Sequence, residues 1–132
     1  TSNSVLITDA DKKILWANAS FLKLTGYSIQ ELTGKSPRIF QYEKTDPAAI
    51  NYINKKLSAH EIVRNVEIQN RGKYGNEYWL ELNIVPIVTD GVITGYIGVE
   101  VDITDRKKIE EELISLNRGL ESKVLENTRK HM

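Results

Sequence analysis

The sequence predicts an α+β fold: a five-stranded antiparallel sheet with short helices on one face and a coiled-coil helix at the C-terminus. Three observations lead to this prediction. Two short apolar runs and two capped segments open the chain, three longer runs joined by short turns fill its second half, and an apolar seam with helical spacing ends it. The 132 residues are 40% hydrophobic and 27% charged, which suits one domain with a packed core.

The N-terminal part predicts two short strands and two short helices. Residues 4–8 and 14–18 are apolar runs separated by a polar turn, which is typical of two adjacent strands. Asn18 supplies a side-chain acceptor that starts a helix, and Gly26 ends it. Residues 28–31 place a serine and a glutamate at capping-box spacing, so a second short helix follows at once.

The middle of the chain predicts a longer helix and then a three-stranded meander. Residues 46–57 begin with Asp-Pro, an N-cap followed by a preferred first helical residue, and their large apolar residues fall on one face. Residues 62–70 alternate apolar and polar side chains, as a half-buried strand does. Residues 77–88 and 92–103 are two more strands, and the short turns between the three predict antiparallel pairing.

The segment from Thr104 onward predicts a helix that needs a partner. Its apolar residues step by four, three, four and four along the chain: Ile109, Leu113, Leu116, Leu120 and Val124. A seam this narrow is typical of a coiled coil, and its 4-4 step is a stutter that locally unwinds the supercoil. Because the seam cannot be buried within this chain, we expect a homodimer through this helix. We therefore divide the chain into an N-terminal domain, 1–104, and a C-terminal coiled-coil helix, 105–132.

Composition excludes several classes of function. Basic and acidic residues number 18 each, so no nucleic-acid surface is expected. The chain has no cysteine, which removes disulfides and thiolate metal sites and fits a reducing, cytoplasmic location. No apolar run approaches the roughly 20 residues of a membrane span, so no direct membrane insertion is expected in this segment.

No catalytic residue and no metal site are predicted. The sequence lacks a glycine-rich phosphate loop, an H-E-x-x-H motif and a serine elbow. His131 also lacks the sequence context of a phospho-accepting helix. We therefore expect a non-catalytic domain.

The order of elements and three motifs resemble the PAS domain family. The motifs are ITDADKKILWANASFLKLTGYSIQELTGK in the N-terminal half, NRGKYGNEYWLELNIVPI in the central hairpin and GVEVDITDRKKIEEEL at the exit into the last helix. Tyr74 replaces the aspartate that the family commonly has in the hairpin turn. The resemblance covers about Ser4 to Glu112, and the residues beyond it are similar to linkers that join PAS domains to histidine-kinase cores.

This resemblance implies a PAS fold and a sensory role in signal transduction. Such a module senses a small ligand, a redox state or a partner. It transmits the signal through a dimeric coiled-coil helix to an output domain, here expected to be the histidine kinase of a two-component system. Two alternatives stay open: a ligand-free module for dimerisation and signal relay, and a flavin-binding redox or light sensor.

The segment GKSPRIFQ, residues 34–41, resembles the G-x-N-C-R-F-L-Q segment of the flavin-binding LOV branch of PAS domains. The resemblance implies that Arg38 holds the flavin phosphate and that Gln41 lines the cofactor site. Asn70 stands where that branch has the first of two flavin-pairing asparagines. Each residue also has a structural alternative: a surface salt bridge for Arg38, and hydrogen bonds beside a strand or turn for Gln41 and Asn70.

Several positions depart from the LOV pattern. Pro37 stands at the position of the adduct-forming cysteine, so no cysteine photoadduct is expected. Leu80 replaces the second pairing asparagine, and an unpaired buried edge costs about 1–3 kcal/mol per group. Glu100 replaces the glutamine of the last strand and is either a pocket group or part of a solvated face. The cofactor is therefore unknown: flavin, as FAD or FMN, is a candidate that the sequence does not indicate, although a related PAS branch binds FAD without the cysteine.

The last strand is the expected exit route of a signal. Alternation places Val99, Val101 and Ile103 on one face of the sheet, with Glu100 and Asp102 on the other. Thr104 is positioned to cap the exit helix through its hydroxyl. Because the junction is short and lacks glycine, we expect it to transmit a shift of the strand to the helix.

Overall fold

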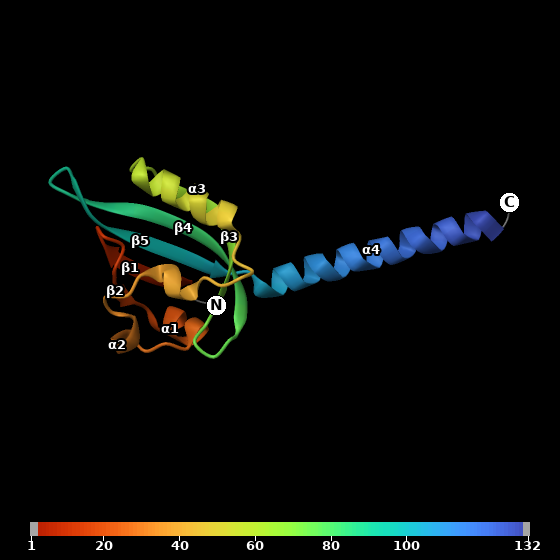
Figure 1. Ribbon diagram of the computed structural model, residues 1–132, viewed down its shortest axis with the longest axis horizontal. Coiled ribbons are helices and arrows are strands. Elements are labelled where there is room, and N and C mark those ends of the chain that lie inside the picture. Colours follow the sequence, from red (N-terminus) through yellow and green to blue (C-terminus); the bar gives the residue numbers. More distant parts are fainter. Residues whose placement is uncertain (1–2, 131–132) are drawn as a thin grey trace.

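The computed structural model describes residues 3–130, with side chains as far as residue 124, so His131 lies outside the described residues. The predicted five-stranded antiparallel sheet is confirmed, in the order β2-β1-β5-β4-β3 (Figure 1). The strands are β1 (Ser4–Asp9), β2 (Ile14–Ala17), β3 (Val63–Arg71), β4 (Glu77–Thr89) and β5 (Val92–Asp102). Because β1 pairs with β5, the first and last strands lie side by side within the sheet.

Short helices cover one face of the sheet, as predicted. They are α1 (Ala19–Thr25), α2 (Ile29–Leu32), the 3-10 helix η1 (Pro37–Phe40) and α3 (Pro47–Ser58). The predicted caps are confirmed. The Asn18 side chain accepts the Phe21 N–H, and Ser28 and Glu31 form a complete capping box. Gly26 ends α1 at φ 77°, a left-handed conformation that glycine adopts without strain.

The short helix η1 was not predicted from the sequence patterns, and the buried ring of Phe40 packs it against the domain. The Ser36 side chain accepts the Arg38 N–H and starts this helix. Phe40 is buried, and its ring centroid lies 5.4 Å from that of Phe21 and 5.8 Å from that of Tyr27, both edge-on. Edge-on pairs add favourable ring electrostatics to apolar burial, so this contact fixes η1 above the sheet.

The hydrophobic core is divided into two clusters. The first lies between α3 and the strands β3 to β5 and contains Ile53, Leu57, Val63, Ile68, Tyr78, Leu80, Leu82 and Tyr96. The second lies around α1, α2, β1 and β2 and contains Leu6, Ile14, Ala17, Phe21, Leu32 and Phe40. Members of both clusters line the space between them, and the candidate site is found there.

The last helix, α4 (Thr104–Lys130), follows β5 and extends away from the domain (Figure 1). Its 27 residues span about 40 Å. The seam residues are each more than half exposed: Ile109, Leu113, Leu116, Leu120 and Val124. Among the described residues, no helix combines the length and the apolar character that crossing a bilayer requires.

Candidate functional site

A cavity of about 440 Å³ lies between the two core clusters. Its lining comes from four strands, β1, β3, β4 and β5, together with η1, α3 and the β1–β2 turn. The larger apolar residues that line it are Leu6, Phe40, Ile50, Ile53, Leu57, Ile68, Leu82, Ile84 and Tyr96. A cavity of this volume, lined by apolar side chains and by convergent polar groups, is typical of a small-molecule site.

The four candidate site residues all line this cavity. Arg38 and Gln41 come from η1 and its C-cap, Asn70 from β3 and Glu100 from β5. Arg38 makes no ion pair with the residues that the structure describes. Asn70 does have a structural contact, because its Oδ1 accepts a 3.5 Å hydrogen bond from the Thr45 hydroxyl. Side chains far apart in the sequence thus meet at one cavity.

The cavity has a cationic end that sequence reasoning missed. Lys12 and Lys13 of the β1–β2 turn line it together with Asp11 and Arg38. The first residue of β2 donates a backbone hydrogen bond of 2.9 Å to Lys35 O, which holds the chain that leads into η1 beside this turn. The three basic side chains outnumber the single carboxylate of Asp11, so they favour the anionic group of a ligand. Turn lysines usually point to solvent, so their spacing alone carried no signal.

Glu100 lies on the cavity side of β5 and is only 7% exposed. The structure therefore decides between the two alternatives: it is a pocket group. Its Oε2 atom is buried and has no hydrogen-bond partner among the described residues. Burial raises the pKa of the Glu100 carboxyl to about 8, so the neutral acid predominates at pH 7. After burial itself, the charge of Glu100 is the next cause that raises the pKa of Tyr78.

The lining suits a flavin at some positions and not at others. Arg38 suits a phosphate, and the Gln41 and Asn70 amides suit polar ring edges. Leu80 is 1% exposed, belongs to the first core cluster and does not line the cavity, so it supplies no edge contact. A neutral Glu100 can donate a hydrogen bond to a carbonyl or ring nitrogen. These residues can together contact a small molecule that carries an anionic group and polar ring edges.

The junction between β5 and α4 corrects one expectation. Thr104 was expected to cap α4, but it is the first helical residue, and Asp102 Oδ1 accepts its backbone N–H at 3.0 Å. The Thr104 hydroxyl donates to the same oxygen at 2.5 Å and accepts the Trp79 N–H of β4 at 3.0 Å. Ile103 is buried and donates its N–H to Trp79 O at 2.9 Å. Lys107 Nζ lies 4.7 Å from the centroid of the Trp79 ring, so the start of α4 is bonded directly to β4.

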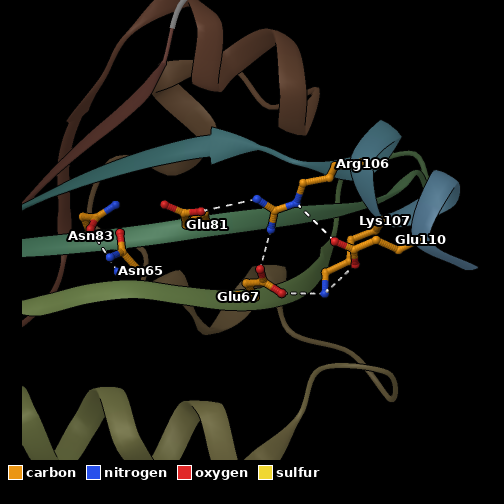
Figure 2. A network of polar contacts seen from close by, with 7 residues as sticks. All are labelled: Asn65, Glu67, Glu81, Asn83, Arg106, Lys107 and Glu110. Atoms are coloured by element: carbon orange, nitrogen blue, oxygen red, sulfur yellow. Dashed lines mark hydrogen bonds and ion pairs between the residues drawn. The ribbon is translucent and has the colours of Figure 1, made fainter.

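A network of charged side chains joins the first turns of α4 to the sheet (Figure 2). Arg106 pairs with Glu67 of β3, with Glu81 of β4 at 3.7 Å and with Glu110 at 3.6 Å. Lys107 pairs with Glu67 at 2.5 Å, and this hydrogen bond is the largest cause that lowers the pKa of Glu67. The pairs between α4 and the sheet were not predicted, because Glu67 and Glu81 lie on other elements than Arg106 and Lys107.

Comparison with known proteins places this geometry in a family. A family model described as PAS domain matches residues 2–105. The chain is 35% identical over 114 residues to the blue-light-activated histidine kinase of Rhizobium johnstonii and 32% identical over 118 residues to the aerotaxis receptor of Escherichia coli. These matches cover 83% and 88% of this chain, but 33% and 23% of those proteins. The chain therefore spans about a third or less of the length of these curated relatives.

A solved structure is also similar. The LOV domain from the Erythrobacter litoralis blue-light activated histidine kinase matches with a TM-score of 0.72 and 30% sequence identity. The match covers 79% of this chain and 98% of that one. The similarity extends to the branch that residues 34–41 resemble, although this chain has no cysteine.

Proposed function

The chain belongs to the PAS domain family, and from this premise we propose what it senses and where its signal goes. Its homology to a blue-light histidine kinase and to an aerotaxis receptor gives it a sensory role in signal transduction, as predicted. In our proposal it is the non-catalytic input module of a longer protein, and it binds a small molecule in the cavity between the two core clusters. Arg38, Gln41, Asn70 and Glu100 are the proposed contacts.

One observation carries this proposal: β5 belongs both to the cavity and to the exit from the domain. Glu100 lines the cavity, and two residues later Asp102 accepts the first N–H of α4. A ligand that displaces Glu100 or changes its charge therefore acts on the strand that begins the helix. The junction contains no glycine and is bonded to β4 at Ile103 and Thr104, so a shift of β5 is passed on instead of being absorbed.

The proposed receivers of the signal are a second copy of α4 and an output domain. In this proposal residues 1–104 are the sensory unit and 105–132 the signalling helix, as the sequence suggested. The exposed seam of Ile109, Leu113 and Leu116 supports a parallel homodimer, because pairing would bury it. The name of the Rhizobium johnstonii relative supports a histidine kinase as the output domain.

Ligand release tests the sensory function. Purified protein is denatured, and the supernatant is analysed by mass spectrometry beside a buffer blank. We expect about one small molecule per protomer. A folded dimer that releases nothing would favour the alternative of a ligand-free relay module.

A flavin sensor is a second candidate, favoured by the LOV-like segment 34–41 and by the similarity to a solved LOV domain. Here Arg38 would hold the phosphate, Gln41 and Asn70 the polar edges, and a neutral Glu100 would donate a hydrogen bond. A bound flavin would supply light absorption or redox chemistry, and the residues of this chain would bind and orient it.

An absorption spectrum before and after blue light tests the flavin candidate. A yellow protein with a flavin spectrum would support it, and a colourless protein that takes up no added FAD or FMN would exclude it. Because the chain has no cysteine, light should produce no long-lived thiol adduct. A long-lived bleached spectrum typical of such an adduct would contradict this expectation.

A further inference from the structure

The cavity has two chemically different ends, one with Glu100 and one with the lysines of the β1–β2 turn. The pairing of β1 with β5 shows that these ends lie apart along the strands. Glu100 pairs with Ser4 at the start of β1, whereas Tyr96 pairs with Thr8, just before the β1–β2 turn and its two lysines. The four steps along the strand from Tyr96 to Glu100 span about 13 Å. A molecule that contacts both ends must therefore be elongated.

Glu100 is not satisfied by any described residue. Its Oε2 atom is buried without a partner, and burial is the sole cause that raises its pKa. The titratable groups nearest in the fold are Tyr78 on β4 and Tyr96 and Asp102 on β5, and none of them bonds to it. Lys12 and Lys13 follow the end of β1 that lies away from Glu100, and neither of them nor Arg38 forms an ion pair with Glu100. A buried polar group without a partner is uncommon in native proteins.

We propose that the ligand of this cavity carries an anionic group toward Lys12, Lys13 and Arg38 and accepts a hydrogen bond from a protonated Glu100, so that ligand binding is linked to the proton on this residue. The inference rests on the proposed sensory function and names the ligand class for its site. A cationic partner for Glu100 is disfavoured, because the protonated carboxyl would give a buried cation no counter-charge. Once ionised, the carboxyl has no donor, and its charge opposes an electron-rich acceptor.

FMN is the probe for this inference, since it carries a phosphate at one end and carbonyl acceptors at the other. Its dissociation constant is measured by fluorescence quenching at pH 6.5 and at pH 9.0. If FMN binds only while Glu100 is protonated, its affinity for the wild-type protein should be about tenfold weaker at pH 9.0. Riboflavin, which lacks the phosphate, should bind less tightly but with the same pH dependence.

Two variants distinguish the effect of the Glu100 proton on FMN binding from the effect of the side-chain shape. Glu100→Gln keeps a donor at every pH, so it should bind FMN about as tightly as the wild type does at pH 6.5, with no loss at pH 9.0. Glu100→Leu keeps the approximate volume without a donor, so it should bind about tenfold more weakly at both pH values. Circular dichroism checks that both variants are folded.

Three results would overturn the inference: wild-type affinity that is constant between the two pH values, affinity that rises with pH as a cationic ligand requires, or no FMN binding at either pH. The sensory function would fail on a different result, namely the absence of any molecule released from the purified protein. A released molecule without an anionic group and without an acceptor would overturn only the inference.

Discussion

Glu100 links the stability of the domain to pH even without a ligand. Burial raises its folded-state pKa to about 8 from a reference value of 4.5, so the folded protein binds a proton that the unfolded chain has lost between these values. The stability that this proton provides is fully present below pH 4.5 and is lost as pH rises through about 8, with a slope of up to about 1.4 kcal/mol per pH unit.

Urea unfolding of the wild type and of Glu100→Gln between pH 5 and pH 9 checks this dependence. The wild type should lose stability relative to the variant across this range, because the amide cannot ionise. Parallel stability curves for the two proteins would mean that Glu100 is already ionised in the folded state.

Gly95 is required by the close approach of β1 and β5. A Cβ at Gly95 would lie 2.3 Å from Thr8 O, which is backbone and cannot turn away. Gly95→Ala should therefore destabilise the domain by about 1–3 kcal/mol, measured by urea unfolding. Gly119→Ala in α4 is the matched control, since its Cβ would meet no atom within 4 Å. A loss of stability in the control that equals the loss at Gly95 would contradict this explanation.

At the residue scale, the sequence predicted which side chains meet but not their chemical state. Arg38 and Gln41 could be placed because a recognisable motif surrounds them, and Asn70 because it precedes the hairpin turn. Lys12 and Lys13 could not, because a turn lysine belongs to the cavity only through the packing of a distant segment. The protonation of Glu100 depends on which face of β5 the helices cover. The alternating pattern shows which residues share a face, but it does not show which face is covered.

At the element scale, the start of α4 is held by two kinds of contact. Backbone and side-chain hydrogen bonds join Ile103 and Thr104 to Trp79, and Glu67 pairs with both Arg106 and Lys107. The pKa of Glu67 is lowered, chiefly by its hydrogen bond with Lys107. The stability that ionised Glu67 adds to the folded state is therefore fully present above the unfolded-state pKa of this carboxyl. It is lost as pH falls through the lower folded-state pKa.

Glu67→Gln should loosen the first turns of α4 while leaving the domain folded. Hydrogen exchange of the amides after Thr104 should become faster at pH 7 and low salt, and added salt should reduce the difference from the wild type. The loss of overall stability should be below about 1 kcal/mol, because the pairs are partly exposed. Glu77→Gln is the control, because it removes a 3.3 Å surface pair with Lys44 and none of the recorded α4 pairs. Equal exchange in α4 of both variants would exclude a holding role for Glu67.

The elements themselves were largely predictable because their signals are local. The caps at Asn18, Ser28 and Asp46 lie within a few residues of the N–H groups that they accept, and the structure confirms all three. The cap of α4 was assigned to Thr104 by the same reasoning, and this was wrong. There the hydroxyl is engaged by Trp79 N–H, a contact 25 residues away in sequence that no local pattern reveals.

At the scale of the whole molecule, the proposed signalling through α4 requires a dimer. Leu116→Glu should weaken dimerisation by at least about 100-fold, because pairing would bury two carboxylates in the seam. Truncation after Asp105 should also weaken it. Ser115→Glu adds the same charge off the seam and should leave the dimer intact. Sedimentation at micromolar concentration measures all three, and a wild-type chain that stays monomeric would exclude the proposed seam.

The most direct test of the central claim is the distance between two α4 helices with the cavity empty and filled. Because the chain has no cysteine, Glu111→Cys attaches one spin label per protomer, on the helix face opposite the seam. Electron–electron double resonance should show one short distance, as in a parallel pair, and addition of FMN or of the molecule that the purified protein releases should change it. Insertion of two glycines between Ile103 and Thr104 should preserve the dimer and remove the change. A distance that does not respond to the ligand in the uninterrupted chain, or a response that survives the insertion, would contradict a signal that leaves the cavity through β5 and α4.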